Sequence, residues 1–166
     1  GLHQVVGFDL ASRLVKTKLG GRGAKPGQFN YPVGVATLSN GDLVVGDFGN
    51  FRIQILSPSG KPLKAWGAPG DRSGSFFRVK GVAVDSDDHI YGADGAFSNI
   101  QVFNRTGQLL TIIGEPGQRK GQFNMPVGLC YKDGRLYVAD QLNQRIQVIR
   151  YAPESDQKGG REGGEK

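Results

Sequence analysis

The sequence GQFNYPVGV at residues 27–35 decides the fold, because it returns almost unchanged as GQFNMPVGL at residues 121–129. A looser copy, GSFFRVKGV, occupies residues 74–82 between them. The glycine near the end of each copy recurs every 47 residues, at Gly34, Gly81 and Gly128. A fixed period of roughly 20 to 50 residues indicates a repeat protein, in which each repeat is one supersecondary unit stacked on its neighbours.

The segments that follow each copy repeat as well. An apolar run ends in aspartate at residues 43–47 (LVVGD), 90–94 (IYGAD) and 136–140 (LYVAD), and a second repeated segment follows at 50–55, 98–102 and 143–148. These runs are short, rich in Val, Ile and aromatic residues, and bounded by Gly, Pro, Asn and Asp, which is typical of strands. Four antiparallel strands per repeat describe a blade of a β-propeller.

The repeat also predicts how the chain is organised. Residues 1–20 align with the second half of a repeat and are expected to form the last two strands of a preceding blade. Residues 21–70 and 71–118 each supply a complete blade, and residues 119–152 supply a blade that lacks its fourth strand. We therefore expect an all-β partial β-propeller of about three blades and 13 strands. Residues 153–166 are polar and glycine-rich and are predicted to be a disordered tail.

Three elements of the repeat together resemble the NHL repeat over residues 1–152. They are the motif G-Q-F-x-x-P-x-G-[VL], a strand ending in Asp, and the motif N-x-R-[IV]-x-[VI]. The middle repeat departs from this pattern, since Val79 replaces the proline and no arginine precedes Ile100. The chain is similar to the C-terminal half of the six-bladed NHL propellers of bacterial envelopes, some of which belong to electron-transfer gene neighbourhoods. That resemblance implies an NHL-type partial propeller with a non-catalytic binding or scaffold role, and it favours a periplasmic or extracellular location.

A ring cannot close with thirteen strands, and a propeller normally hides its sheet edges by closing. Two alternatives follow. Either the chain is a fragment of a longer polypeptide, which its start in mid-blade without methionine favours, or two copies assemble into a homodimer. In both cases we expect the remaining blades or a partner chain to cover the two ends.

Residues that recur at one position of every repeat are expected to serve the blade rather than a reaction. The aspartates should accept hydrogen bonds from backbone N–H groups of the next turn, the phenylalanines should wedge between blades, and the glycines should permit close approach of the innermost strands. These structural positions are Asp47, Asp94 and Asp140; Phe29, Phe76 and Phe123; and Gly34, Gly81 and Gly128.

Composition excludes several kinds of site. The chain has two histidines and a single cysteine, Cys130, at unrelated repeat positions, whereas a zinc site needs three or four converging ligands. Cys130 aligns with Ala36 and Ala83, so we expect it to be a small buried residue. No nucleophile–base pair, phosphate loop or carboxylate pair is evident. The sequence therefore predicts no catalytic residue, no cofactor and no metal.

The expected function is binding of protein partners by loops at one end of the blades. The loop residues proposed for this role are Phe48, Phe51, Arg52, Phe97, Gln141 and Arg145. The net charge of +6 supports an alternative, in which the aromatic side chains stack with RNA bases beside arginine or lysine. A further alternative is part of a propeller lyase or hydrolase whose site lies in other blades.

Overall fold

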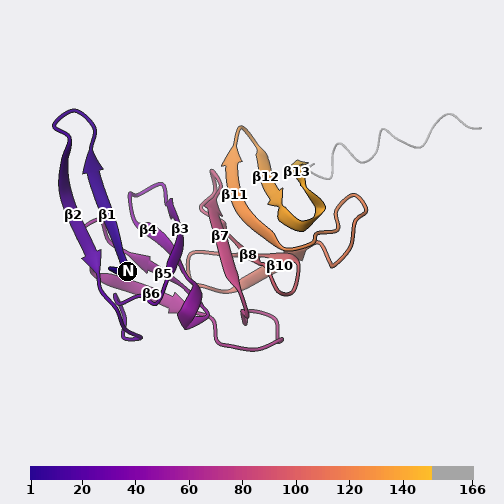
Figure 1. Ribbon diagram of the computed structural model, residues 1–166, viewed down its shortest axis with the longest axis horizontal. Coiled ribbons are helices and arrows are strands. Elements are labelled where there is room, and N and C mark those ends of the chain that lie inside the picture. The colour runs from indigo at the N-terminus through magenta and orange to yellow at the C-terminus, as the bar shows by residue number, and fades with distance from the viewer. Residues whose placement is uncertain (151–166) are drawn as a thin grey trace, which may run out of the picture.

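The computed structural model describes residues 1–150 and contains thirteen strands in four antiparallel sheets of two, four, four and three strands (Figure 1). This confirms the predicted all-β partial propeller. The first two sheets contain β1 (Gln4–Asp9) and β2 (Leu14–Gly20), then β3 (Pro32–Thr37), β4 (Leu43–Asp47), β5 (Arg52–Leu56) and β6 (Pro62–Trp66). The last two contain β7 (Val79–Val84), β8 (Ile90–Asp94), β9 (Asn99–Phe103) and β10 (Leu109–Ile113), then β11 (Pro126–Lys132), β12 (Arg135–Asp140) and β13 (Arg145–Arg150).

Each sheet is a meander, because its strands pair in the order in which they occur in the chain. The sheets follow one another along the long axis of the molecule, from the indigo β1–β2 hairpin to the yellow β13 (Figure 1). The predicted disordered tail, residues 153–166, lies outside the described residues. Within residues 1–150, no helix has the length and apolar character needed to cross a membrane.

Three apolar clusters hold neighbouring sheets together. Val5 of β1 packs against Phe29, Val45 and Leu56 between the first and second sheets. The cluster between the second and third sheets is the largest and includes Ile53, Phe76 and Phe103. Phe123, Leu136 and Val138 pack with Ile100 between the third and fourth sheets. Burial of these faces against one another is the main stabilising term in such a stack.

Each repeat is joined to the preceding blade by a glycine and a phenylalanine. Gly20, Gly67 and Gly114 end or follow the outermost strand with positive φ values of 83°, 110° and 79°. A Cβ at Gly20 or Gly114 would collide with the ring of Phe29 or Phe123. A Cβ at Gly67 would lie 2.6 Å from the Phe51 carbonyl oxygen and 3.0 Å from the Phe76 ring, and all three rings are fully buried. Glycine is needed both because it adopts a positive φ without strain and because it leaves room for the phenylalanine ring.

The innermost strands approach one another most closely at glycines. A Cβ at Gly34 would lie 3.1 Å from the Val82 nitrogen, and one at Gly81 would lie 2.8 Å from the backbone of Leu129. The first strands of successive blades therefore touch through their backbones. The third repeat glycine, Gly128, would place its Cβ 3.3 Å from Ala139.

One expectation about the last sheet was wrong. Cys130 is exposed, although the aligned Ala83 is buried between the third and fourth sheets. Cys130 lies on the face of β11 that points away from the third sheet, where no described residue covers it. The alignment gave its repeat position correctly but could not show that a neighbouring blade is needed for burial there.

Candidate functional site on the aspartate face

The repeated aspartates gather at one end of the sheets. Asp47, Asp94 and Asp140 end the second strand of their sheets and pair with Pro32, Val79 and Pro126, which begin the first strands. We call this end the aspartate face. It is formed by the loops at residues 27–31, 74–78 and 121–125 and by the turns at residues 48–51, 95–98 and 141–144.

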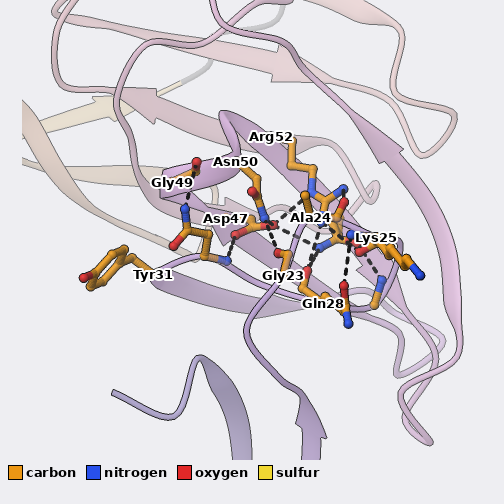
Figure 2. Close-up of polar contacts among 12 residues, drawn as sticks. Gly23, Ala24, Lys25, Gln28, Tyr31, Asp47, Gly49, Asn50 and Arg52 are labelled. Carbon is orange, nitrogen blue, oxygen red and sulfur yellow. Dashed lines mark hydrogen bonds and ion pairs between the residues drawn. The ribbon is translucent and has the colours of Figure 1, made fainter.

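In the β3–β6 sheet, Asp47 is the centre of a buried polar network (Figure 2). One carboxylate oxygen accepts the backbone N–H of Asn30 at 2.7 Å. The other accepts Asn50 Nδ2 at 2.8 Å, Arg52 Nε at 2.9 Å and Gln54 Nε2 at 3.2 Å. The guanidinium of Arg52 also donates to the carbonyl oxygens of Ala24, Lys25 and Gln28. The network therefore ties the leading loop to the second and third strands.

The β11–β13 sheet repeats this arrangement. Asp140 accepts the Asn124 N–H at 2.7 Å and the side chains of Asn143, Arg145 and Gln147 at 2.8–3.1 Å. Burial opposes ionisation of Asp140, but the hydrogen bonds outweigh it and lower the pKa of this carboxyl. The Asp140 carboxylate is consequently charged at neutral pH and paired with Arg145. Its role is therefore to hold the blade together.

The middle sheet departs from this network at three positions. Phe77, Phe97 and Asn99 stand where the first full blade has Asn30, Asn50 and Arg52. The Asp94 carboxylate instead accepts hydrogen bonds from backbone N–H groups. The donors are Phe77 and Arg78 before β7 and Ala96 and Phe97 in the turn after β8. Because Asp94 no longer needs side-chain donors, the positions that supplied them are available for other residues.

The two substituted phenylalanines form an aromatic row with a third. The ring centroids of Phe51 and Phe77 are 6.3 Å apart, and those of Phe77 and Phe97 are 6.4 Å apart. Phe77, at the centre, is 50% exposed. Beside the row, Lys80 Nζ lies 4.8 Å from the ring centroid of Phe48, and Arg78 is exposed. The middle of the aspartate face is therefore aromatic and basic.

The loop residues predicted to bind a partner separate into two groups. Phe48, Phe51 and Phe97 lie together on the aspartate face, and Gln141 is exposed in the turn η2 (Gln141–Asn143) of the last sheet. Arg52 and Arg145 instead direct their guanidinium groups into the Asp47 and Asp140 networks. Sequence reasoning missed Phe77, although its place in the asparagine position of the other two repeats was a usable signal.

A second polar cluster lies at the opposite end of the middle sheet. Asp85, Asp87 and His89 each place a ligand atom within 4.8 Å of the others, and His89 Nδ1 lies 2.9 Å from Asp85 Oδ2. Of the described residues these are the ones grouped closely enough to hold a metal ion. Sequence analysis did not connect these three residues, because the cluster does not recur in the other repeats.

Comparison with known proteins agrees with this geometry. The NHL repeat family matches residues 29–56 and 123–149, which carry the two networks centred on Asp47 and Asp140. Human E3 ubiquitin-protein ligase TRIM32 is 44% identical over 43 residues, a segment covering 26% of this chain and 7% of that protein.

Solved structures share the fold at low sequence identity. Virginiamycin B lyase from Staphylococcus aureus superposes with a TM-score of 0.60 at 15% identity, over 92% of this chain and 50% of that one. The calcium-binding protein regucalcin from Agrobacterium tumefaciens gives a TM-score of 0.58 at 16% identity, over 82% of this chain and 49% of that one. The chain thus spans about half the length of these structures and a small part of TRIM32.

The sheets and their order define a partial β-propeller. The repeated network and the family match define its type: the chain is a partial β-propeller with NHL repeats at residues 29–56 and 123–149.

Proposed function

We propose that this chain is a non-catalytic binding module that holds a protein partner on its aspartate face. The observation that carries the proposal is the aromatic row of Phe51, Phe77 and Phe97. Two of these rings replace asparagines that elsewhere hold the blade together, and Phe77 is left half-exposed. Exposed aromatic side chains on a rigid scaffold are typical anchors of protein interfaces.

The surroundings of the row indicate the chemistry of the partner. Lys80 and Arg78 flank the rings, so an apolar side chain followed by a carboxylate would find matching groups on this face. The match to part of TRIM32 and to the NHL repeat supports a protein-interaction module of this general kind. The finer expectation, a scaffold within a six-bladed ring of a bacterial envelope or electron-transfer assembly, is part of the same proposal.

Phe77→Asn tests the proposal, because it restores the residue of the neighbouring repeats. Proteins retained by the immobilised chain should be lost on this substitution, while Leu63→Asn, at an exposed position of β6, should retain them. The truncated ring should weaken binding by about tenfold or more, as expected for an interface anchor. Equal retention by all three chains, with unchanged melting temperatures, would refute the proposal.

A second candidate, binding of single-stranded RNA, is favoured by the same neighbourhood of exposed Phe77 and basic Arg78 and Lys80. Fluorescence anisotropy with a short labelled RNA distinguishes the two functions. RNA binding should fall steeply between about 50 mM and about 200 mM salt because phosphate contacts release counterions. Protein binding through the aromatic row, with a single carboxylate paired to Arg78 or Lys80, should change far less steeply over that range.

A further inference from the structure

A cavity of about 390 Å³ lies between the third and fourth sheets, away from the aspartate face. Its wall includes Asp85, His89 and Tyr91 on one side and Ile113, Tyr131 and Ile149 on the others. This volume is in the usual range for small-molecule sites, roughly 300 to 1,000 Å³.

The repeat explains why the space is open here and filled one blade earlier. Between the second and third sheets, Trp66 packs on Phe103 with ring centroids 5.5 Å apart, and Leu38 and Val44 complete the core. Strand pairing places Ile113 and Ile149 at the positions of those two aromatic residues. Two isoleucines occupy less volume than a tryptophan and a phenylalanine, so the interface between the third and fourth sheets keeps a hollow.

The same comparison shows that the polar wall replaces apolar core. Asp85 stands at the position of Leu38, and Tyr91 stands at that of Val44. The hydroxyl of Tyr91 and the Nδ1–H of His89 both donate to Asp85 Oδ2 at 2.9 Å. Burial, together with the neighbouring Asp85, raises the pKa of Tyr91, which therefore stays a neutral hydroxyl.

The polar wall presents carboxylates to the cavity. Because the Asp85 carboxylate only accepts hydrogen bonds, Nδ1 of His89 carries the proton in the hydrogen bond between them. Asp87 adds an exposed carboxylate. Among the described residues that line the cavity there is no lysine or arginine, although the chain carries a net charge of +6. The lining is thus locally anionic within a basic protein.

Aromatic faces complete the chemistry. The rings of Tyr91 and Tyr131 are stacked, with centroids 6.2 Å apart and planes 16° from parallel. Aromatic faces beside carboxylates favour organic cations, through cation–π attraction and charge pairing. The remaining wall, which includes Val102, Ile113 and Ile149, is apolar and suits a hydrocarbon body.

From these features we propose that the cavity binds a small organic cation, an ammonium group carried on an aromatic or aliphatic body. The ammonium group lies against the Asp85 and Asp87 carboxylates and the tyrosines, and the body lies against the isoleucines. No repeat-locked residue of the aspartate face takes part, so this site is independent of the partner-binding surface.

Calorimetric titration of the full chain in EDTA tests the site with phenethylamine, 2-phenylethanol and 3-phenylpropanoate as probes. EDTA removes any metal that the Asp85–His89 cluster could hold. We expect the amine to bind about tenfold or more tightly than the alcohol, with no binding of the carboxylate. Equal affinity for amine and alcohol would overturn the proposal.

The matched variants fill the cavity or leave it open. Ile113→Trp introduces the residue found at Trp66 and should abolish amine binding without lowering the melting temperature, whereas Ile112→Trp, at the neighbouring position on β10 outside the lining, should bind normally. Asp87→Asn should weaken amine binding by about threefold or more, in keeping with loss of an exposed charge pair. Unchanged amine binding by Ile113→Trp would show that the cavity is not the site.

Discussion

Asp88 of the third sheet is bound to Ser39 of the second sheet by two short hydrogen bonds. The backbone N–H of Ser39 donates to Asp88 Oδ1 at 2.7 Å, and its hydroxyl donates to Oδ2 at 2.6 Å. Arg105 of the third sheet adds a contact to the same carboxylate at 3.2 Å. This clamp joins hairpin turns of adjacent blades at the end opposite the aspartate face.

Loss of the clamp should loosen the contact between the second and third sheets. Asp88→Ala leaves the Ser39 N–H without its acceptor, so we expect the free energy of unfolding to fall by about 1 to 3 kcal/mol. Urea denaturation followed by circular dichroism measures the change. Asp87→Ala, one residue earlier and exposed, serves as the control and should leave stability unchanged.

The Asp47 network should be still more important for stability. Asp47→Ala removes a fully buried carboxylate and leaves the Arg52 guanidinium, which is 13% exposed, without its ionic partner. Breaking such a pair costs about 3 to 5 kcal/mol. Thermal melting should show a large decrease for Asp47→Ala and none for Asp71→Ala, an exposed loop position. A variant that kept its melting temperature but lost partner binding would contradict the structural role of Asp47.

The lowered pKa of Asp140 predicts how stability depends on pH. Because the folded-state pKa lies below the ordinary value of 3.8, the ionised carboxylate stabilises the fold fully above that value. The contribution is lost as pH falls through the folded-state pKa. Asp140→Asn should therefore be less stable than the wild type at neutral pH, and the difference in melting temperature should shrink on acidification. A constant difference down to strongly acidic pH would rule out this linkage.

The outward faces of the first and last sheets should make the described chain self-associate. Val6, Phe8 and Val15 are exposed on the β1–β2 hairpin, and Ile146 and Val148 are exposed on β13. Apolar patches of this kind are rarely left open on monomers. Sedimentation should show concentration-dependent association, with the predicted homodimer as one form. The pair Ile146→Lys and Val148→Lys should reduce it. A monomer at every concentration for the unsubstituted chain would contradict the expectation.

Much of the fold could be predicted because the same order of strands and turns recurs in every repeat. Runs of apolar residues that end in Asp47, Asp94 and Asp140 keep their spacing, so each turn and strand supports the assignment of the others. That redundancy predicted thirteen antiparallel strands, and the structure confirms them. The partners of Gln54 and Arg52 were less accessible, since their bonds reach loops more than twenty residues earlier in the chain.

The distinctive features lie where the repeat is broken, and redundancy cannot help there. Phe77 in an asparagine position and Asp85 in a leucine position look like ordinary drift in a single sequence. Their meaning depends on what the neighbouring blade presents, as the rings of Phe51 and Phe97 do for Phe77. Cys130 shows the same limit, because its repeat position was correct while its burial depended on a face that no described residue covers.

The glycine–phenylalanine joint sets the frame in which a chain of this type can be copied. Phe76 is encoded with the strands that follow it, yet its ring rests on Gly67, which belongs to the blade before. A gene duplication with its breakpoint between these two residues would place each phenylalanine ring against the equivalent residue of another copy. The rings would still pack only if that residue is glycine in every copy. Recombination within the strands keeps each phenylalanine together with the glycine that its ring contacts. Lengthening or shortening such a propeller by whole units should therefore succeed most readily when the breakpoints avoid residues 67–76.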